Sequence, residues 1–135
     1  MASTNKKVCL LFILMQISIV AISSAQISST GDTVIFSYVE HMPEFKGDMV
    51  AFISNQMRPE FRITGSDKVT TIFLKCMINE HGKVASVYVT NPSSHQPANA
   101  EAVRIVKSMP DWIPGRQNNK AVRVYVKIPI KLRTD

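Results

Sequence analysis

Histidine, cysteine and glycine are all scarce in this chain of 135 residues, and their scarcity argues against most catalytic and metal sites. The three histidines are His41, His81 and His95, and none has a cysteine or carboxylate at metal-ligand spacing. The five glycines form no phosphate-binding loop, and the acidic residues stand singly rather than in pairs. We therefore expect neither an enzyme nor a bound cofactor.

Long hydrophobic runs are also rare, and the one conspicuous run lies at the N-terminus. Lys6 and Lys7 precede an apolar segment over residues 8–22, which ends in small residues up to Ala25. This order is typical of a secretory signal peptide cleaved before Gln26. The alternative is an uncleaved membrane anchor, but the run is shorter than the roughly 20 residues that a span needs. We predict a signal peptide over residues 1–25 and an exported protein.

The exported part of the chain would keep one cysteine, Cys76, and a small positive charge. A single cysteine cannot form an internal disulfide, and Cys76 falls in an apolar strand pattern typical of a buried thiol. Without Lys6 and Lys7, 14 of the 16 basic residues remain against 10 acidic ones, a formal charge of +4. That excess suits solubility and is too small to indicate a nucleic-acid partner.

The order of periodic segments predicts an α+β fold. A hairpin and a returning strand, with the helices on one face, indicate a two-layer sandwich. The predicted elements are a strand over 34–39, a helix over 46–57, strands over 69–78 and 84–90, a helix from 99 to 109, and a strand over 121–132.

Several local features refine these elements. Gly82 ends the hairpin turn that starts at Asn79 and is placed for a positive φ. Val84 is out of step with the strand that follows, which predicts a bulge near Ala85 and Ser86. In the second helix, Asn99 is the expected N-cap, and Glu101 is expected in the first turn, where the helix dipole favours an acid.

The last strand carries the strongest indication of function, because it contains Pro129. Proline has no N–H and is confined within sheets to edges or bulges, so this strand is predicted to be an edge. An exposed edge is a place where another chain can add a strand. The only tryptophan, Trp112, stands between Pro110 and Pro114 and is more typical of a core anchor than of a recognition residue.

Taken together, these segments resemble the C-terminal domain of TonB energy-transducing proteins, in the form found in Bacteroidetes. The resemblance covers about residues 39–132. It is carried by Val39-Glu-His-Met-Pro-Glu-Phe-Lys-Gly47, by the Asn79–Gly82 turn, and most specifically by Ala102-Val-Arg-Ile-Val-Lys-Ser-Met-Pro-Asp-Trp-Ile-Pro-Gly115 with Asn119-Lys-Ala-Val122 and Val126-Lys-Ile-Pro-Ile130.

The resemblance implies a periplasmic domain of two helices on a three-stranded antiparallel sheet. In such domains the terminal strand receives the TonB box, a short extended segment of an outer-membrane transporter. The expected domain is then 39–135, after a flexible leader and short strand over 26–38. The partner-binding residues are Val122, Arg123, Val124, Tyr125, Val126, Lys127, Ile128 and Ile130, and the structural anchors are Trp112, Pro114, Gly115 and Pro129.

Two departures from the family are visible. The leader over residues 26–33 reaches only about 29 Å at ~3.6 Å per residue, so it cannot cross a periplasm as the spacer of a full transducer does. Many members also carry Tyr-Pro after the first helix, where this chain has Arg58-Pro59.

These features predict a non-catalytic module that captures an extended peptide by strand addition along residues 122–130. Proline at Val124 or Val126 is then expected to block binding and leave the fold largely intact. The alternatives are a homodimer that pairs its own edges and a membrane-anchored transducer that retains residues 8–22.

Overall fold

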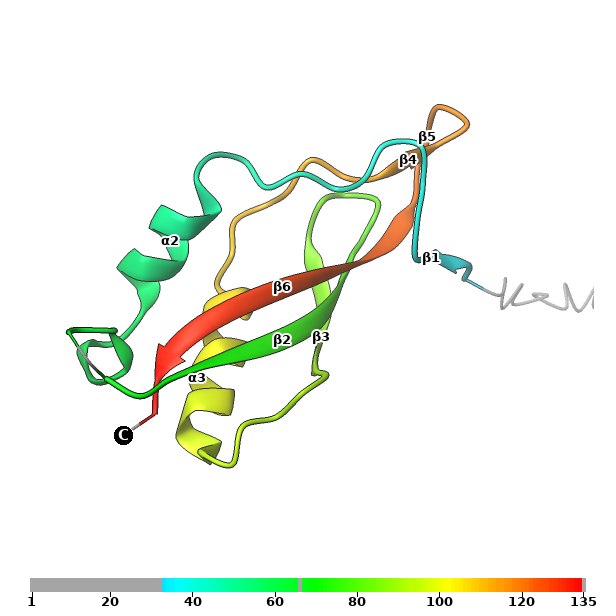
Figure 1. Cartoon of the computed structure of the whole chain (residues 1–135). Helices are drawn as coiled ribbons and strands as arrows, with labels where there is room; N and C mark the ends of the chain where they lie inside the picture. Colours follow the sequence, from blue (N-terminus) through cyan, green and yellow to red (C-terminus); the bar gives the residue numbers. More distant parts are fainter. Residues whose placement is uncertain (1–32, 66, 135) are drawn as a thin grey trace, which may run out of the picture. The chain divides into compact units, whose positions relative to one another are not determined.

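A computed structural model describes residues 33–65 and 67–134, so the predicted signal peptide lies outside the described residues. Its elements confirm the α+β class and are labelled as in Figure 1. They are β1 (Ile35–Phe36), α2 (Met49–Gln56), the 3-10 turn η1 (Pro59–Phe61), β2 (Val69–Ile78), β3 (Val84–Val89), α3 (Gln96–Lys107), β4 (Arg116–Gln117), β5 (Lys120–Ala121) and β6 (Arg123–Arg133).

The main sheet has four strands in the order β1-β6-β2-β3, not the three expected. β2 is antiparallel to both β3 and β6, and it pairs with β6 in one unbroken register from Val69↔Arg133 to Ile78↔Val124. The fourth strand is the short β1, which joins β6 in parallel through Ile35↔Arg123 and Phe36↔Val124. The sheet is therefore mixed.

A second, two-stranded sheet lies just before β6. β4 and β5 form a tight hairpin in which Asn118 and Asn119 both have positive φ, the conformation that a type I′ turn requires. Arg116 of β4 also pairs antiparallel with His41 through two backbone hydrogen bonds of 3.1 and 2.8 Å. The chain before α2 is thus held against the chain before β6.

Alternating residues of β2 and β6 form the centre of the core. α3 contacts β2, β3 and β6, η1 contacts β6, and Met49, Phe52 and Ile53 of α2 are partly buried against the core cluster. The buried residues of this cluster are Met57, Phe61, Ile72, Leu74, Cys76, Ile78, Ala98, Ala102, Ile105, Val106, Met109, Trp112, Ile128, Ile130 and Leu132. Burial raises the pKa of the Cys76 thiol to about 12, so this cysteine is an inert core residue.

Both helices start where local chemistry allows, and one start differs from the expectation. Asp48 caps α2 by accepting a hydrogen bond of 3.0 Å from the Ala51 N–H. α3 begins at Gln96 rather than near Asn99, because Pro97 is tolerated in a first helical turn. The Asn99 side chain instead bonds the N–H and C=O of Ser93, each at 2.8 Å, and closes the preceding loop.

The β2–β3 hairpin has the predicted turn and bulge. The register shifts between Met77↔Ser86 and Ile78↔Val84, so Ala85 is the extra residue. Gly82 has φ +80° and lies against the backbone of Trp112, whose N–H donates to the Gly82 carbonyl at 2.7 Å. A Cβ atom at Gly82 would lie 2.0 Å from the Trp112 carbonyl oxygen. Only glycine fits there.

The structure places Trp112 in the core, with 3 % of its surface exposed. Its ring meets Phe45 edge-on, with 5.4 Å between the ring centroids, and Phe45 lies 5.6 Å from Phe52 of α2. Gly115 is also buried, and a Cβ there would come within 2.6 Å of Val124 Cγ2. Pro114 is half-buried between them.

Glu101 is the charged residue of the core, and its position corrects the expectation of a first-turn acid. It lies in the middle of α3 with no exposed surface. Its carboxylate accepts hydrogen bonds from Arg104 at 2.8 and 2.9 Å, and from the Nε and the backbone N–H of Arg58 at 2.8 and 2.9 Å. Arg104 also donates to the Gln56 carbonyl at the end of α2. Glu101 and Arg104 therefore join α3 to the end of α2 and to Arg58, which follows it.

The close approach at Gly82 leads to a prediction with a matched control. Gly82→Ala is expected to lower the free energy of unfolding by more than about 2 kcal/mol, through left-handed strain and the clash with Trp112. Gly65→Ala adds the same methyl group at φ +62° with nothing within 4 Å, and is expected to cost only about 1 kcal/mol. Urea denaturation measures both, and equal losses would contradict the role of the Trp112 contact.

The buried carboxylate leads to a pH prediction. Hydrogen bonds from Arg104 and Arg58 outweigh burial and hold the pKa of Glu101 at about 2, below its ordinary 4.5. The stabilisation is therefore complete above pH 4.5 and is lost as the pH falls toward 2. Glu101→Gln is expected to cost about 3 kcal/mol at pH 7 and to remove this acid-labile component.

The control is Glu60→Gln, because Glu60 meets the same Arg58 from the surface at 3.7 Å with its side chain 55 % exposed. It is expected to change stability by less than about 1 kcal/mol. Urea midpoints at pH 7 and pH 3 measure both variants. A Glu101→Gln variant with the same pH dependence as the unaltered protein would contradict the assignment.

Candidate functional site

The backbone of β6 presents one row of polar groups to β2 and the other row to the outer edge. The Thr134 N–H donates to the Lys68 carbonyl at 3.0 Å, which identifies Lys68 and Thr134 as a hydrogen-bonded pair. Hydrogen-bonded pairs alternate along an antiparallel ladder, so the even-numbered residues of β6 bond β2. The odd-numbered residues from Tyr125 to Arg133 consequently direct N–H and C=O groups away from β2.

Pro129 is one of these odd-numbered residues. Its partner in the register is Phe73, whose carbonyl bonds the Thr90 N–H on the β3 side at 2.9 Å, away from β6. The missing N–H of Pro129 is thus on the outer edge, where β2 does not need it. This position explains how a proline stands in the middle of an eleven-residue strand without breaking the sheet.

The start of β6 is paired within the domain, and part of the predicted site lies there. Arg123 and Val124 are covered by β1, and Val122 precedes the strand and donates its N–H to the Gly115 carbonyl at 3.0 Å. Among the described residues, no strand pairs with the outer edge of β6 beyond Val124. Of the predicted site over residues 122–130, the residues from Tyr125 onward therefore lie on the part of β6 that no described strand covers (Figure 1).

The alternation of hydrogen-bonded pairs also changes the effect expected from proline at Val124 or Val126. Val124 and Val126 are even-numbered and pair with Ile78 and Cys76 of β2. Proline at either position removes a hydrogen bond of the sheet itself, so it is expected to damage the fold as well as the edge.

Side chains of the predicted site divide between the two faces of the sheet. Val124, Ile128 and Ile130 are buried in the core, and Val126 is half-buried against it. Lys127 and Pro129 are exposed on the opposite face, and Tyr125 is half-buried there. Within residues 125–131, the residues whose backbone groups face outward are therefore the odd-numbered ones, whose side chains lie on the face opposite the core.

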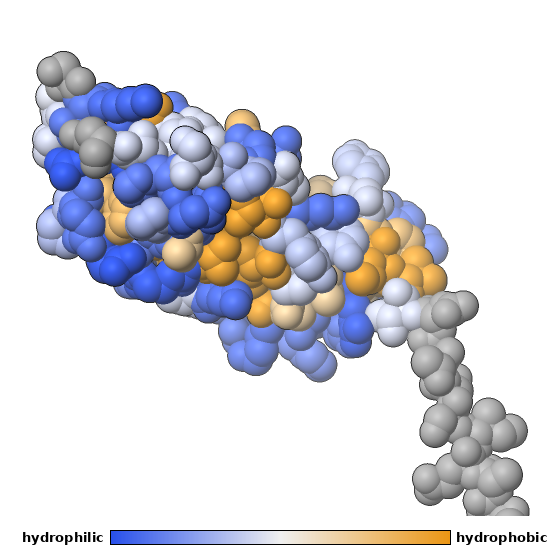
Figure 2. All heavy atoms as spheres, turned by 90° about the horizontal axis from the view of Figure 1, so that it is seen from below, coloured by the Kyte–Doolittle hydropathy of each residue, from blue (hydrophilic) through white to orange (hydrophobic). Residues whose placement is uncertain are grey.

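The face opposite the helices combines aromatic rings with lysines. The Lys75 Nζ lies 4.0 Å from the centre of the Tyr125 ring, and the Lys127 Nζ lies 4.4 Å from that of Phe73. Such contacts hold ammonium groups over aromatic faces and leave the charge at the surface. On the face turned toward the viewer in Figure 2, hydrophobic areas of surface are likewise interrupted by hydrophilic side chains.

Arg123, predicted as a partner-binding residue, forms an ion pair within the domain. Its guanidinium donates to both carboxylate oxygens of Glu80 at 2.9 and 3.3 Å. This contact holds the pKa of Glu80 at about 2, below its ordinary 4.5. The ion pair ties the β2–β3 turn to the start of β6, so Arg123 contributes to the scaffold.

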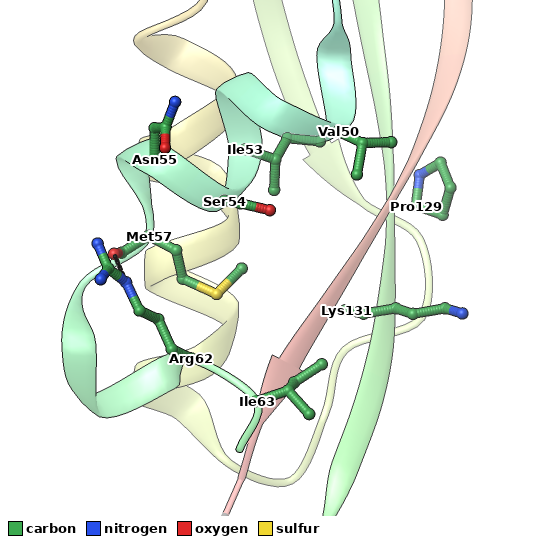
Figure 3. A pocket seen from close by; sticks show the side chains of 9 residues that line it. All are labelled: Val50, Ile53, Ser54, Asn55, Met57, Arg62, Ile63, Pro129 and Lys131. Atoms are coloured by element: carbon green, nitrogen blue, oxygen red, sulfur yellow. Dashed lines mark hydrogen bonds between the residues drawn. The ribbon is translucent and has the colours of Figure 1, made fainter. Parts of the chain in front are cut away.

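Beside the open edge lies a groove that sequence reasoning missed. It has a volume of about 670 Å³ and runs between α2 and the outer edge of β6 (Figure 3). The residues that line it are Val50, Ile53, Ser54, Asn55, Met57, Arg62, Ile63, Pro129 and Lys131. Val50 and Ile63 are 74 % and 43 % exposed. No local pattern of the sequence indicates this groove, because its two sides come from separate segments of the chain.

Two further observations bear on other kinds of function. Within residues 33–65 and 67–134, no helix has the length and hydrophobicity of a membrane span. The same part of the chain holds no group of three or more histidine, cysteine or acidic side chains able to bind a metal ion.

Comparison with known proteins identifies the family. No curated protein and no solved structure matches the chain. The family described as Gram-negative bacterial TonB protein C-terminal matches residues 66–133, which is 68 of the 135 residues and spans β2, β3, α3 and β6. Domains of this family are periplasmic, non-enzymatic interaction modules of TonB-dependent transport and interact with outer-membrane transporters. The chain therefore belongs to the TonB C-terminal domain family.

Proposed function

We propose that this domain captures an extended segment of an outer-membrane transporter, similar to a TonB box, by strand addition at the outer edge of β6. The observation that carries the proposal is the row of outward backbone groups on the odd-numbered residues from Tyr125 to Lys131. A strand added there bonds to N–H and C=O groups that face away from β2. The domain acts by binding, with no catalytic step.

The electrostatics of the edge favour a neutral or acidic segment. Lys127 and Lys131 are exposed beside the outward backbone groups, and within the described residues neither has a carboxylate within ion-pair distance. Their charges are screened in salt, so they are expected to guide association and register more than to supply affinity.

The substitution that tests the edge is Lys127→Pro, compared with Val126→Pro. Lys127→Pro removes an outward N–H just as Pro129 does naturally, so the sheet is expected to survive. Affinity for a synthetic transporter segment is expected to fall about tenfold or more, because a carbonyl of the peptide loses its donor. Titration calorimetry measures the affinity, and urea denaturation measures the stability.

Val126→Pro removes a hydrogen bond to Cys76 in β2 and is expected to lower the free energy of unfolding by about 1–3 kcal/mol. A Lys127→Pro variant that folds normally and binds the segment with unchanged affinity would refute strand addition at this edge.

Sedimentation of the unaltered protein with and without the segment separates capture of the segment from self-pairing. A dimer that the segment does not dissociate would favour the homodimer.

A further inference from the structure

The groove between α2 and β6 lies where the side chains of an added strand would be directed. Neighbouring strands lie about 4.8 Å apart, so a strand paired with Pro129 and Lys131 passes along the groove that these two residues line. Successive side chains of that strand point to opposite faces of the sheet. Every second side chain would therefore be on the side where the helices lie.

The contacts of α2 and η1 show which side of the sheet the groove belongs to. Met57 and Phe61 are buried in the same cluster as Ile130 and Leu132, so this part of the chain packs on the core face of β6. In Figure 3 the side chains of Val50 and Ile53 extend from α2 toward β6, and Ile63 lies at the lower end of the groove. These apolar groups are positioned to receive a side chain from the core side of an added strand.

The composition of the lining sets the chemistry of the occupant. Val50, Ile53, Met57, Ile63 and Pro129 supply apolar surface. The charged groups of the lining are Arg62 and Lys131, both basic. An acidic or neutral segment fits this charge, and a basic side chain would be repelled.

We propose that this groove is the side-chain subsite for the captured segment and selects a large aliphatic residue at one position. The residues on either side of it, which face away from the helices, lie beside Lys127 and are neutral or acidic. This inference rests on the proposed function, because it requires a strand at the β6 edge. It adds a specificity that backbone pairing alone does not provide, since main-chain hydrogen bonds are the same for every sequence.

The test uses blocked nine-residue peptides of threonine and valine in which one position carries leucine, alanine or lysine. The guest is moved through the central positions, and binding is measured by fluorescence polarisation. Leucine is expected to bind about tenfold more tightly than alanine at positions of one parity, because part of its extra surface is buried in the groove. Lysine is expected to bind more weakly than alanine at the same positions.

Two exposed residues of the groove are then altered together, as Val50→Ala with Ile63→Ala. Both side chains project to the surface, so the fold is expected to tolerate the change, and the preference for leucine is expected to fall below about threefold. Val34→Ala is the matched control, because Val34 is 64 % exposed near the start of β6 and does not line the groove. It is expected to leave the preference unchanged.

The outcomes separate the two proposals. Lys127→Pro is expected to weaken all the peptides by a similar factor, whereas the groove variant weakens only those with leucine. Leucine and alanine binding equally to the unaltered protein, or a preference that persists in the groove variant, would overturn the subsite and leave strand addition standing. If the unaltered protein binds none of the peptides, or Lys127→Pro binds all of them normally, both proposals fail.

Discussion

The unbroken register between β2 and β6 determines nearly everything else in this domain. Ten consecutive pairs without a bulge fix which residues of β6 bond to β2 and which are free to bond elsewhere. The same alternation sends Ile128, Ile130 and Leu132 into the core and Lys127 and Lys131 to the opposite face. A shift of one residue would exchange these two sets, burying lysines and exposing the core. The scaffold and the outer edge are therefore set by one constraint.

Much of the fold was accessible from the sequence because its signals are local. The alternation over residues 121–132 identified the faces of β6, Gly82 identified the hairpin turn, and the misplaced Val84 identified the bulge. Pro129 marked the part of β6 that no described strand covers, since proline lacks an N–H, although β1 pairs with the start of the strand. These features depend on neighbours in the chain, which a sequence displays directly.

The remaining features depend on contacts between distant residues. Glu101 was expected in a first helical turn, but its partner Arg58 is 43 residues away, and no local pattern signals that ion pair. The two residues of β1 are too few for strand periodicity to show which strand they join. Which backbone groups of β6 face outward depends on its register with β2, and the sequence does not display that register. The positions at which a proline substitution would leave the sheet intact could therefore not be predicted from the sequence. The groove combines α2 with β6 and has no sequence signature at all.

The proline on the outer edge makes that edge asymmetric toward possible partners. A foreign strand that pairs with β6 meets one position at which its own acceptor finds no donor. Two copies of β6 related by a twofold axis would meet this defect twice, once for each Pro129, whatever their relative register. The cost of the missing donor thus falls more heavily on identical partners than on different ones. For strand addition at this edge, the proline in the middle of β6 would thus favour a different chain over a second copy of the domain.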